Sequence, residues 1–207
     1  MHRFFTYTAA VTTACAAGRA AAQSPRPQPP LAPYVAQRVA VMPVQLLRSD
    51  TGALVTAGAW NAFRRELDDS IGSAIAARGL GSKWAYATDV ARAAKRNMAY
   101  VSDPYTLGAQ SLVRIVYKSG DRIPELFASN LRSQIAVGDA RFALVPVELA
   151  FVRIGRRQRA TLRVVLVDGR GGLFMWVGDV ASDPVDVLSP LVLTSLAARV
   201  ADLVAAP

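Results

Sequence analysis

The sequence predicts an α/β fold of the α+β kind: a single mixed sheet that ends in a three-stranded antiparallel meander, with helices packed against it. Three observations lead to this fold class. A β-branched, apolar run opens the folded region at 38–44, and segments with apolar residues three and four apart follow it. The late stretch 141–181 instead alternates with a period of two and is interrupted by glycine turns. The sequence shows no internal repeat, so we expect 38–207 to be a single α/β domain.

The first strand is expected near the centre of the sheet, because 38–44 is apolar throughout. A second, short strand at 83–87 is expected at an edge. Helical spacing begins at Ala59 and stops at Gly79, and it places Asp68 and Asp69 on the solvent side.

Local signals predict three more helices before the meander. Thr88 is expected to cap a helix over 88–97, and the pair Asp103-Pro104 repeats that pattern for a helix over 105–113. A helix that begins at Pro124-Glu125 and ends at Gly138 follows. Its expected apolar side consists of Leu126, Phe127, Leu131 and Ile135.

The meander is predicted from three alternating runs, 141–154, 157–168 and 173–181, joined at Gly155 and at the glycine-rich run 168–172. Simple alternation puts Ala143, Val145, Val147, Leu149 and Phe151 on one face of its first strand. A final helix after Ser189-Pro190 is expected to bury Val192, Leu196, Val200 and Leu203.

The amino terminus has the features of a secretory signal peptide. A positive start is followed by a mostly apolar run over 4–18, and the sequence Ala20-Ala21-Ala22 fits a small-residue cleavage site. The run is shorter than the roughly 20 residues that a spanning helix needs. We therefore expect residues 1–22 to be removed and the chain to be exported to the periplasm. Cys15 leaves open a lipid-attached form at the outer membrane, although Thr12 stands where the lipid signal prefers leucine.

Residues 23–37 are rich in proline and predict an extended tether between the signal and the domain. A tether suits a domain held near a membrane, and an unselected leader explains it equally well. No later run approaches a spanning segment, so peripheral membrane association remains open.

The composition excludes most enzyme chemistry. The sole histidine, His2, and the sole cysteine, Cys15, both lie in the predicted signal. The processed chain then lacks an imidazole base, a thiolate nucleophile and the ligands that soft metals prefer, so we expect no catalytic residue, cofactor or metal site. Carboxylate-only chemistry is the alternative, as in a hydrolase of cell-wall polymers. That alternative depends on the three glutamates of the chain: Glu66, Glu125 and Glu148.

The chain is basic, with a formal net charge of +9, and 21 of its 24 basic residues are arginine. Arginine binds phosphate and carboxylate groups bidentately, so an acidic protein or an anionic envelope polymer is a compatible partner. Arginine-rich codon usage accounts for the same composition. Export argues against nucleic acid as the partner. The sequence does not indicate an oligomeric state.

Two groups of residues are candidates for partner binding. The first hairpin of the meander holds five arginines, of which alternation puts three on the face opposite its apolar residues. These could meet an acidic partner or could protect the hairpin from edge pairing. The second group is a pair of tyrosines near Asp103 in a predicted loop. The candidates are Arg153, Arg156, Arg157, Arg159, Arg163, Tyr100 and Tyr105.

Two segments resemble a known group of periplasmic domains. The strand 38–44, Arg-Val-Ala-Val-Met-Pro-Val, with the loop and amphipathic helix after it, and the run 166–176, with its aspartate, glycines and aromatic residues, carry the resemblance. The group comprises the curli-secretion outer-membrane lipoprotein, the lipoprotein activators of penicillin-binding proteins and the amino-terminal domain of the Tol translocation protein. The resemblance spans roughly 38–204 and implies a non-enzymatic envelope adaptor that works by contacting other proteins. The long pore-forming hairpins of the curli protein have no counterpart here, so pore formation is not implied.

Overall fold

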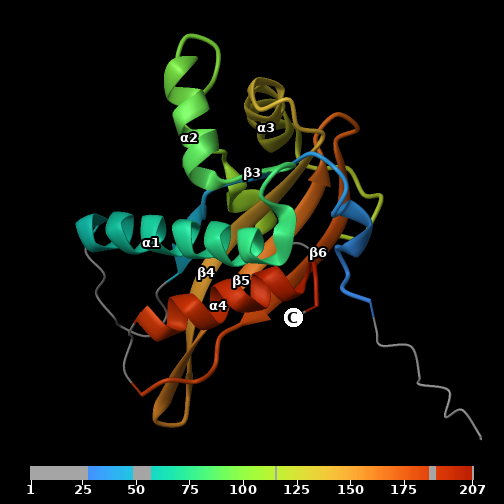
Figure 1. The fold of residues 1–207 in the computed structure, drawn as a ribbon. Helices are drawn as coiled ribbons and strands as arrows, with labels where there is room; N and C mark the ends of the chain where they lie inside the picture. Colours follow the sequence, from blue (N-terminus) through green and yellow to red (C-terminus); the bar gives the residue numbers. More distant parts are fainter. Residues whose placement is uncertain (1–27, 49–56, 115, 187–189, 207) are drawn as a thin grey trace, which may run out of the picture.

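The structure is a computed structural model that describes residues 28–48, 57–114, 116–186 and 190–206 (Figure 1). The predicted signal peptide and Cys15 lie outside the described residues. One mixed sheet of six strands organises this part of the chain, in the order β3-β1-β4-β5-β6, with β2 also paired to β4. The strands are β1 (Val39–Val41), β2 (Leu46–Arg48), β3 (Trp84–Ala85), β4 (Phe142–Ile154), β5 (Arg157–Asp168) and β6 (Leu173–Ala181).

The sheet combines parallel and antiparallel pairs, which confirms the predicted fold class. Strand β1 pairs in parallel with both β3 and β4, so it lies inside the sheet, and β3 forms an edge, as expected. Strands β4, β5 and β6 form the antiparallel meander. Sequence reasoning missed β2, a strand of three residues that pairs in parallel with β4. It falls in the stretch interpreted as a loop, because three residues are too few to show a period.

Two helices cover one face of the sheet. Helices α1 (Ala57–Ile75) and α4 (Pro190–Asp202) lie across this face (Figure 1). They bury Ile71 and Leu196 in an apolar core with even-numbered residues of β5 such as Leu162. The helical spacing read from the sequence is therefore the spacing of the buried side of each helix.

Two shorter helices cover the other face. Helices α2 (Ala87–Arg96) and α3 (Glu125–Val137) bury Val90 and Phe127 in a second core with odd-numbered residues of β5 such as Val165. Each face of the sheet therefore has its own apolar core, and strand alternation divides the residues of β5 between them.

Strand β4 contains a β-bulge, which changes the face of the sheet that its later residues occupy. Pairing with β5 shifts by one residue between Pro146 and Glu148, so Val147 is inserted without a partner of its own. As a result Val145 and Val147 pack in the core under α3, whereas Leu149 and Phe151 pack in the core under α1 and α4. The prediction that all these residues share one face was therefore wrong, because the bulge reverses the alternation at that point.

The predicted helix over 105–113 was also wrong. Only a 3₁₀ turn, Ala109–Leu112, forms there. The side chain of Asp103 accepts a hydrogen bond from the backbone N–H of Tyr105, at 3.0 Å, which closes a turn instead of a helix. Gly108 then adopts a φ of 79°, which no helix accommodates.

The remaining helix limits agree with the signals, with two exceptions. Gly79 turns the chain after α1 with a φ of 82°, and Gly138 caps α3, both as predicted. Thr88 does not cap α2; it lies in the first turn, and its hydroxyl donates to Asp69 at 2.8 Å. Leu126 does not join the apolar side of α3, because 72% of it is exposed.

The carboxyl-terminal part of the predicted tether packs against the fold. Leu31 is fully buried, and its backbone N–H donates to the carbonyl of Leu203 at 2.8 Å. A 3₁₀ turn, Ala32–Tyr34, follows and places the Tyr34 ring edge-on to Phe142. In the described parts of the chain, every helix is too short or too polar to cross a membrane.

Candidate functional site

The arginine-rich hairpin lies at one end of the sheet, beyond the helices (Figure 1). Its strands are joined by Gly155 and Arg156, and Gly155 has a φ of 62°. A positive φ at the first of two turn residues fits a type II′ turn, which matches the twist of a hairpin and favours glycine. The hairpin is therefore a regular, tight structure whose position is set by the sheet.

The five arginines do not form one uniform stripe. Arg157, Arg159 and Arg163 share the α3-side face of the sheet, because they are odd-numbered residues of β5 like Val165. Arg153 pairs with Gln158 and therefore points to the opposite face, and Arg156 occupies the turn.

Arg163 belongs to an ionic row across the sheet. It lies opposite Glu148 of β4 and Asp179 of β6, and its guanidinium is 3.9 Å from the Asp179 carboxylate. Arg48 of β2 extends the row, 3.6 Å from Glu148. Only 21% of the Arg163 side chain is exposed. These charges line a small cavity of about 140 Å³, so Arg163 has a structural role in the sheet as well as any role in binding.

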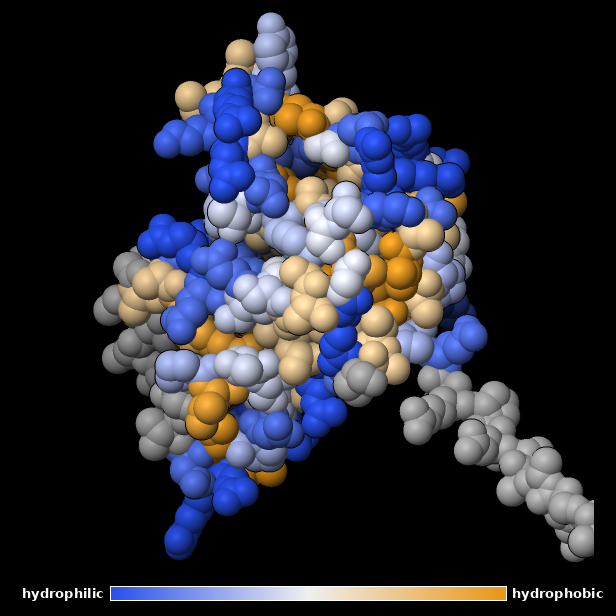
Figure 2. Space-filling view, viewed as in Figure 1, coloured by the Kyte–Doolittle hydropathy of each residue, from blue (hydrophilic) through white to orange (hydrophobic). Residues whose placement is uncertain are grey.

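Nearer the turn the arginines are exposed. Arg157 pairs with Asp186 at 3.1 Å in solvent. Within the described residues Arg153 and Arg156 have no ion-pair partner and are exposed. The apolar neighbours of Arg153 on either side, at positions 152 and 154, are 45% and 44% exposed. Figure 2 shows strongly hydrophilic side chains at the lower tip of the molecule, where Figure 1 places this hairpin.

The two candidate tyrosines lie in the loop between α2, which stands at the opposite end of the molecule (Figure 1), and the 3₁₀ turn. Gln45, buried between β1 and β2, holds this loop in place. Its side-chain amide donates to the carbonyls of Pro43 and Pro104, at 2.7 and 2.9 Å, and accepts from the N–H of Leu107 at 3.0 Å. The loop forms only isolated turns of its own, such as that closed by the Thr106 N–H on the Asp103 carbonyl at 3.0 Å, so this buried amide adds the ties that a helix would otherwise provide.

A cavity of about 550 Å³ opens beside this loop. Tyr105 and Pro104 line one side of it, and Lys95 and Met98, at the end of α2, line the other. Met98 is 75% exposed and Tyr100 is 85% exposed. Exposed aromatic and methionine side chains beside a preformed apolar cavity are typical of protein contact sites.

Asp68, which lies near Tyr105, is not on the solvent side of its helix as predicted. It was expected on the solvent side of α1, but it is only 4% exposed, and its carboxylate accepts the N–H of Val44 at 2.9 Å. Burial raises the pKa of Asp68 to about 7, although the Val44 N–H and the charge of Arg64 act in the opposite direction. Arg64 in turn stacks on the ring of Tyr105, at 4.2 Å from its centre. Asp69 is exposed, as predicted.

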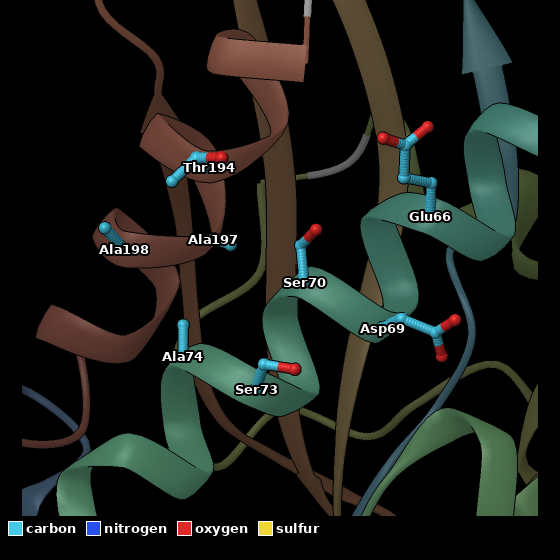
Figure 3. Close-up of a pocket in the computed structure, with 8 residues that line it drawn as sticks. All are labelled: Glu66, Asp69, Ser70, Ser73, Ala74, Thr194, Ala197 and Ala198. Carbon is cyan, nitrogen blue, oxygen red and sulfur yellow. The ribbon is translucent and has the colours of Figure 1, made fainter.

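A shallow groove of about 700 Å³ runs between α1 and α4 (Figure 3). Figure 3 shows that short side chains line it, with Glu66 and Asp69 at one end. These short residues are Ser70, Ser73 and Ala74 from α1 and Thr194, Ala197 and Ala198 from α4. The short side chains allow the two helices to approach closely, which accounts for the groove in packing terms.

The glycine-rich run 168–172 is a structural turn between β5 and β6. The Asp168 carboxylate accepts the N–H groups of Arg170 and Gly171, each at 3.0 Å, so the chain itself occupies the amides that an anion would need. Arg141 binds its other oxygen at 2.9 Å. Burial acts to raise the pKa of Asp168, but these hydrogen bonds and the Arg141 charge outweigh it and hold the pKa below its usual value.

The three glutamates are not brought together. Glu66 is on α1, on one side of the sheet; Glu125 begins α3 on the other and pairs with Arg132 at 2.9 Å. Glu148 lies within the ionic row of the sheet. A pair of carboxylates that acts on a glycosidic bond must flank it, roughly 5 to 10 Å apart, and Glu66 lies across the sheet from the other two. Glu125 and Glu148 share the α3 side, but each is engaged by an arginine, Arg132 and Arg48 respectively.

No protein-family model and no curated protein matches this sequence. Among solved structures, the C-terminal domain of LpoB from Salmonella enterica is similar, with a TM-score of 0.38 and 15% identity over 73% of this chain and 93% of that one. PelC from Paraburkholderia phytofirmans, solved as a dodecamer, has a TM-score of 0.44 and 14% identity over 86% of this chain and 93% of its own. E. coli LpoB, solved by NMR, has a TM-score of 0.39 and 15% identity over 88% and 84%.

LpoB is an activator lipoprotein of a penicillin-binding protein, so these neighbours agree with the resemblance stated from the sequence. At these identities and TM-scores the likeness concerns the order of helices and strands. Any function therefore has to be inferred from the chain's own residues.

Proposed function

We propose that this chain is an exported, non-enzymatic adaptor of the cell envelope, which binds another envelope protein or an anionic envelope polymer. The observation that carries the proposal is the Tyr105 cavity with its exposed rim. Met98, which lines a cavity of about 550 Å³, and Tyr100, two residues further along the same loop, both present large side chains to solvent. A protein partner could bury these side chains and fill the cavity with one of its own.

The loop that carries the rim is held by residues other than those it exposes. Gln45 and two amides of α3, from Asn130 and Gln134, fix its backbone, so its shape does not depend on Met98 or Tyr100. A loop that is fixed before binding loses less conformational entropy when a partner docks. The exposed side chains are therefore available for a partner without being needed for the fold.

The non-enzymatic character is supported by composition and by the placement of the carboxylates. The chain from residue 23 onward has no histidine and no cysteine. Its glutamates are divided between the two sides of the sheet. A cell-wall hydrolase that works with carboxylates alone would need two of them facing one substrate.

The test is site-specific crosslinking in intact envelopes. A photoreactive amino acid is placed at position 100 and, in a matched control, at Leu191, which is also exposed (72%) but lies on α4. We expect position 100 to crosslink reproducibly to one envelope protein and position 191 to give none of that product. Tyr105→Ala is expected to lower the yield at position 100 at least tenfold with the melting temperature little changed.

Equal yields from positions 100 and 191, or an unchanged yield in Tyr105→Ala, would remove the Tyr105 cavity as the contact site. Turnover of purified peptidoglycan by the wild-type protein, lost in Glu148→Gln, would favour the hydrolase instead.

A further inference from the structure

We infer that the end of the β4–β5 hairpin, residues 152–159, docks on the anionic surface of a lipid bilayer. In this arrangement its arginines contact lipid phosphates while Val152 and Ile154 enter the headgroup layer. The inference rests on the proposed export, which brings the chain to a membrane surface, and it names the anionic ligand of the hairpin.

The charge of the hairpin end is one-sided. Residues 152–159 read Val-Arg-Ile-Gly-Arg-Arg-Gln-Arg, with four arginines and no acidic residue. Among the described residues only Asp186 offsets this charge, through its pair with Arg157. Arginine binds phosphate groups bidentately, and each cation held near an anionic bilayer strengthens binding.

The apolar residues of the hairpin end lie on the same face as two of the arginines. Val152 is directly opposite Arg159, and Ile154 is directly opposite Arg157. Near half of each apolar side chain is exposed, although the rest of β4 is mostly buried. An alternation of β-branched and cationic side chains is suited to an interface at which apolar groups leave water and cations stay at the phosphates.

The shape of the hairpin end favours a bilayer over the other occupants. It is a narrow, convex end that extends past α4 (Figure 1), whereas protein hot spots usually combine an anchor with a cavity, as the Tyr105 end does. A soluble polyanion would account for the arginines but would leave Val152 and Ile154 in water. A bilayer surface is soft, so it can adapt to a convex end on the sides that Val185 and Asp186 leave open.

The experiment measures cosedimentation of the protein, purified as the cell processes it, with lipid vesicles. One set contains equal parts of phosphatidylglycerol and phosphatidylcholine, and the other contains phosphatidylcholine alone. We expect binding to the anionic vesicles only, and weaker binding as salt is raised. Arg153→Gln with Arg156→Gln should weaken binding roughly ten- to thirtyfold, since each cation contributes about a factor of five.

Two further double variants separate the causes. Val152→Thr with Ile154→Thr keeps the β-branched shape and should weaken binding several-fold, because the apolar contribution is lost. Lys95→Gln with Arg96→Gln removes the same charge at the opposite end of the molecule and should leave vesicle binding within about twofold of wild type, since those cations lie away from the bilayer. Circular dichroism and melting curves confirm that each variant is folded.

Equal loss in the Lys95/Arg96 variant would mean that net charge alone drives binding, and it would overturn the inference. Binding of soluble polyglutamate as tight as that of vesicles, unaffected by the two threonines, would assign the hairpin to a polymer and would also overturn it. Either result leaves crosslinking from position 100 unchanged, so the adaptor proposal is tested separately.

Discussion

The two ends of this molecule are built in opposite ways. At the Tyr105 end an irregular loop is fixed from below by side-chain amides, those of Gln45, Asn130 and Gln134. At the hairpin end a regular pair of strands extends past the cores, and apart from the strands only Val185 and Asp186, which bond Gln158 and Arg157, are seen to hold it within the described residues. The shape of the exposed surface at the Tyr105 end therefore depends on buried residues, whereas the shape of the exposed surface at the hairpin end does not.

Because of this difference, substitutions at the two ends should affect stability and binding differently. A substitution beneath the Tyr105 loop should change the free energy of unfolding and the contact surface together. A substitution at the tip of the hairpin should change binding alone.

The largest effect is expected for Gln45→Ala. It leaves the N–H of Leu107 and the carbonyl of Pro104 without their buried partner, so the free energy of unfolding should fall by about 3 to 4 kcal/mol. Urea unfolding measures this change. Gln110→Ala, at an exposed position of the same region, is the control and should stay within about 0.5 kcal/mol of wild type. A small loss in Gln45→Ala would show that the loop is held by other contacts.

The next effect concerns pH. Burial raises the pKa of Asp68 from 3.8 to about 7, so between these values the folded chain keeps a proton that the unfolded chain releases. The contribution of the Asp68 carboxyl to the free energy of unfolding is therefore present at low pH and is lost as the pH rises. The loss should be about 2 to 3 kcal/mol between roughly pH 5 and pH 8.

Asp68→Asn imitates the protonated form and should remove most of this dependence. Unfolding curves for both proteins across that pH range provide the measurement, and Asp69→Asn, one residue away but exposed, is the matched control. A parallel pH profile for wild type and Asp68→Asn would contradict the assignment of the titration to this buried carboxyl.

The smallest expected changes in the free energy of unfolding concern the arginines of the hairpin, which should differ from one another. Arg163→Gln removes the central cation of the ionic row between Glu148 and Asp179 and should cost about 1 kcal/mol. Arg153→Gln with Arg156→Gln should stay within about 0.5 kcal/mol of wild type, because both side chains are exposed. Thermal unfolding compares the two. Equal costs would show that the hairpin end supports the fold and that the two ends do not differ in this way.

Only part of the candidate site could be predicted from the sequence. The arginines and both tyrosines could be named because their residue types and local pattern are visible, and whether they bind a partner stays a prediction. The ionic role of Arg163 could not be foreseen, since Glu148 and Asp179 reach it through pairings in a sheet. Asp68 was misplaced for a related reason: helical spacing gives the side of a helix, and the packing of Val44 against that side decides what is buried.

The sequence alone determined the fold class, the central first strand, the meander and most helix limits. These follow from period, glycine and proline, which act over a few neighbouring residues. Only the tertiary structure decided the bulge at Val147, the strand β2 and the fate of 105–113. The bulge and β2 depend on pairing with strands distant in the chain, and the 105–113 loop combines the local Asp103 turn with bonds to the distant Gln45 amide; no local pattern records where such distant partners will lie.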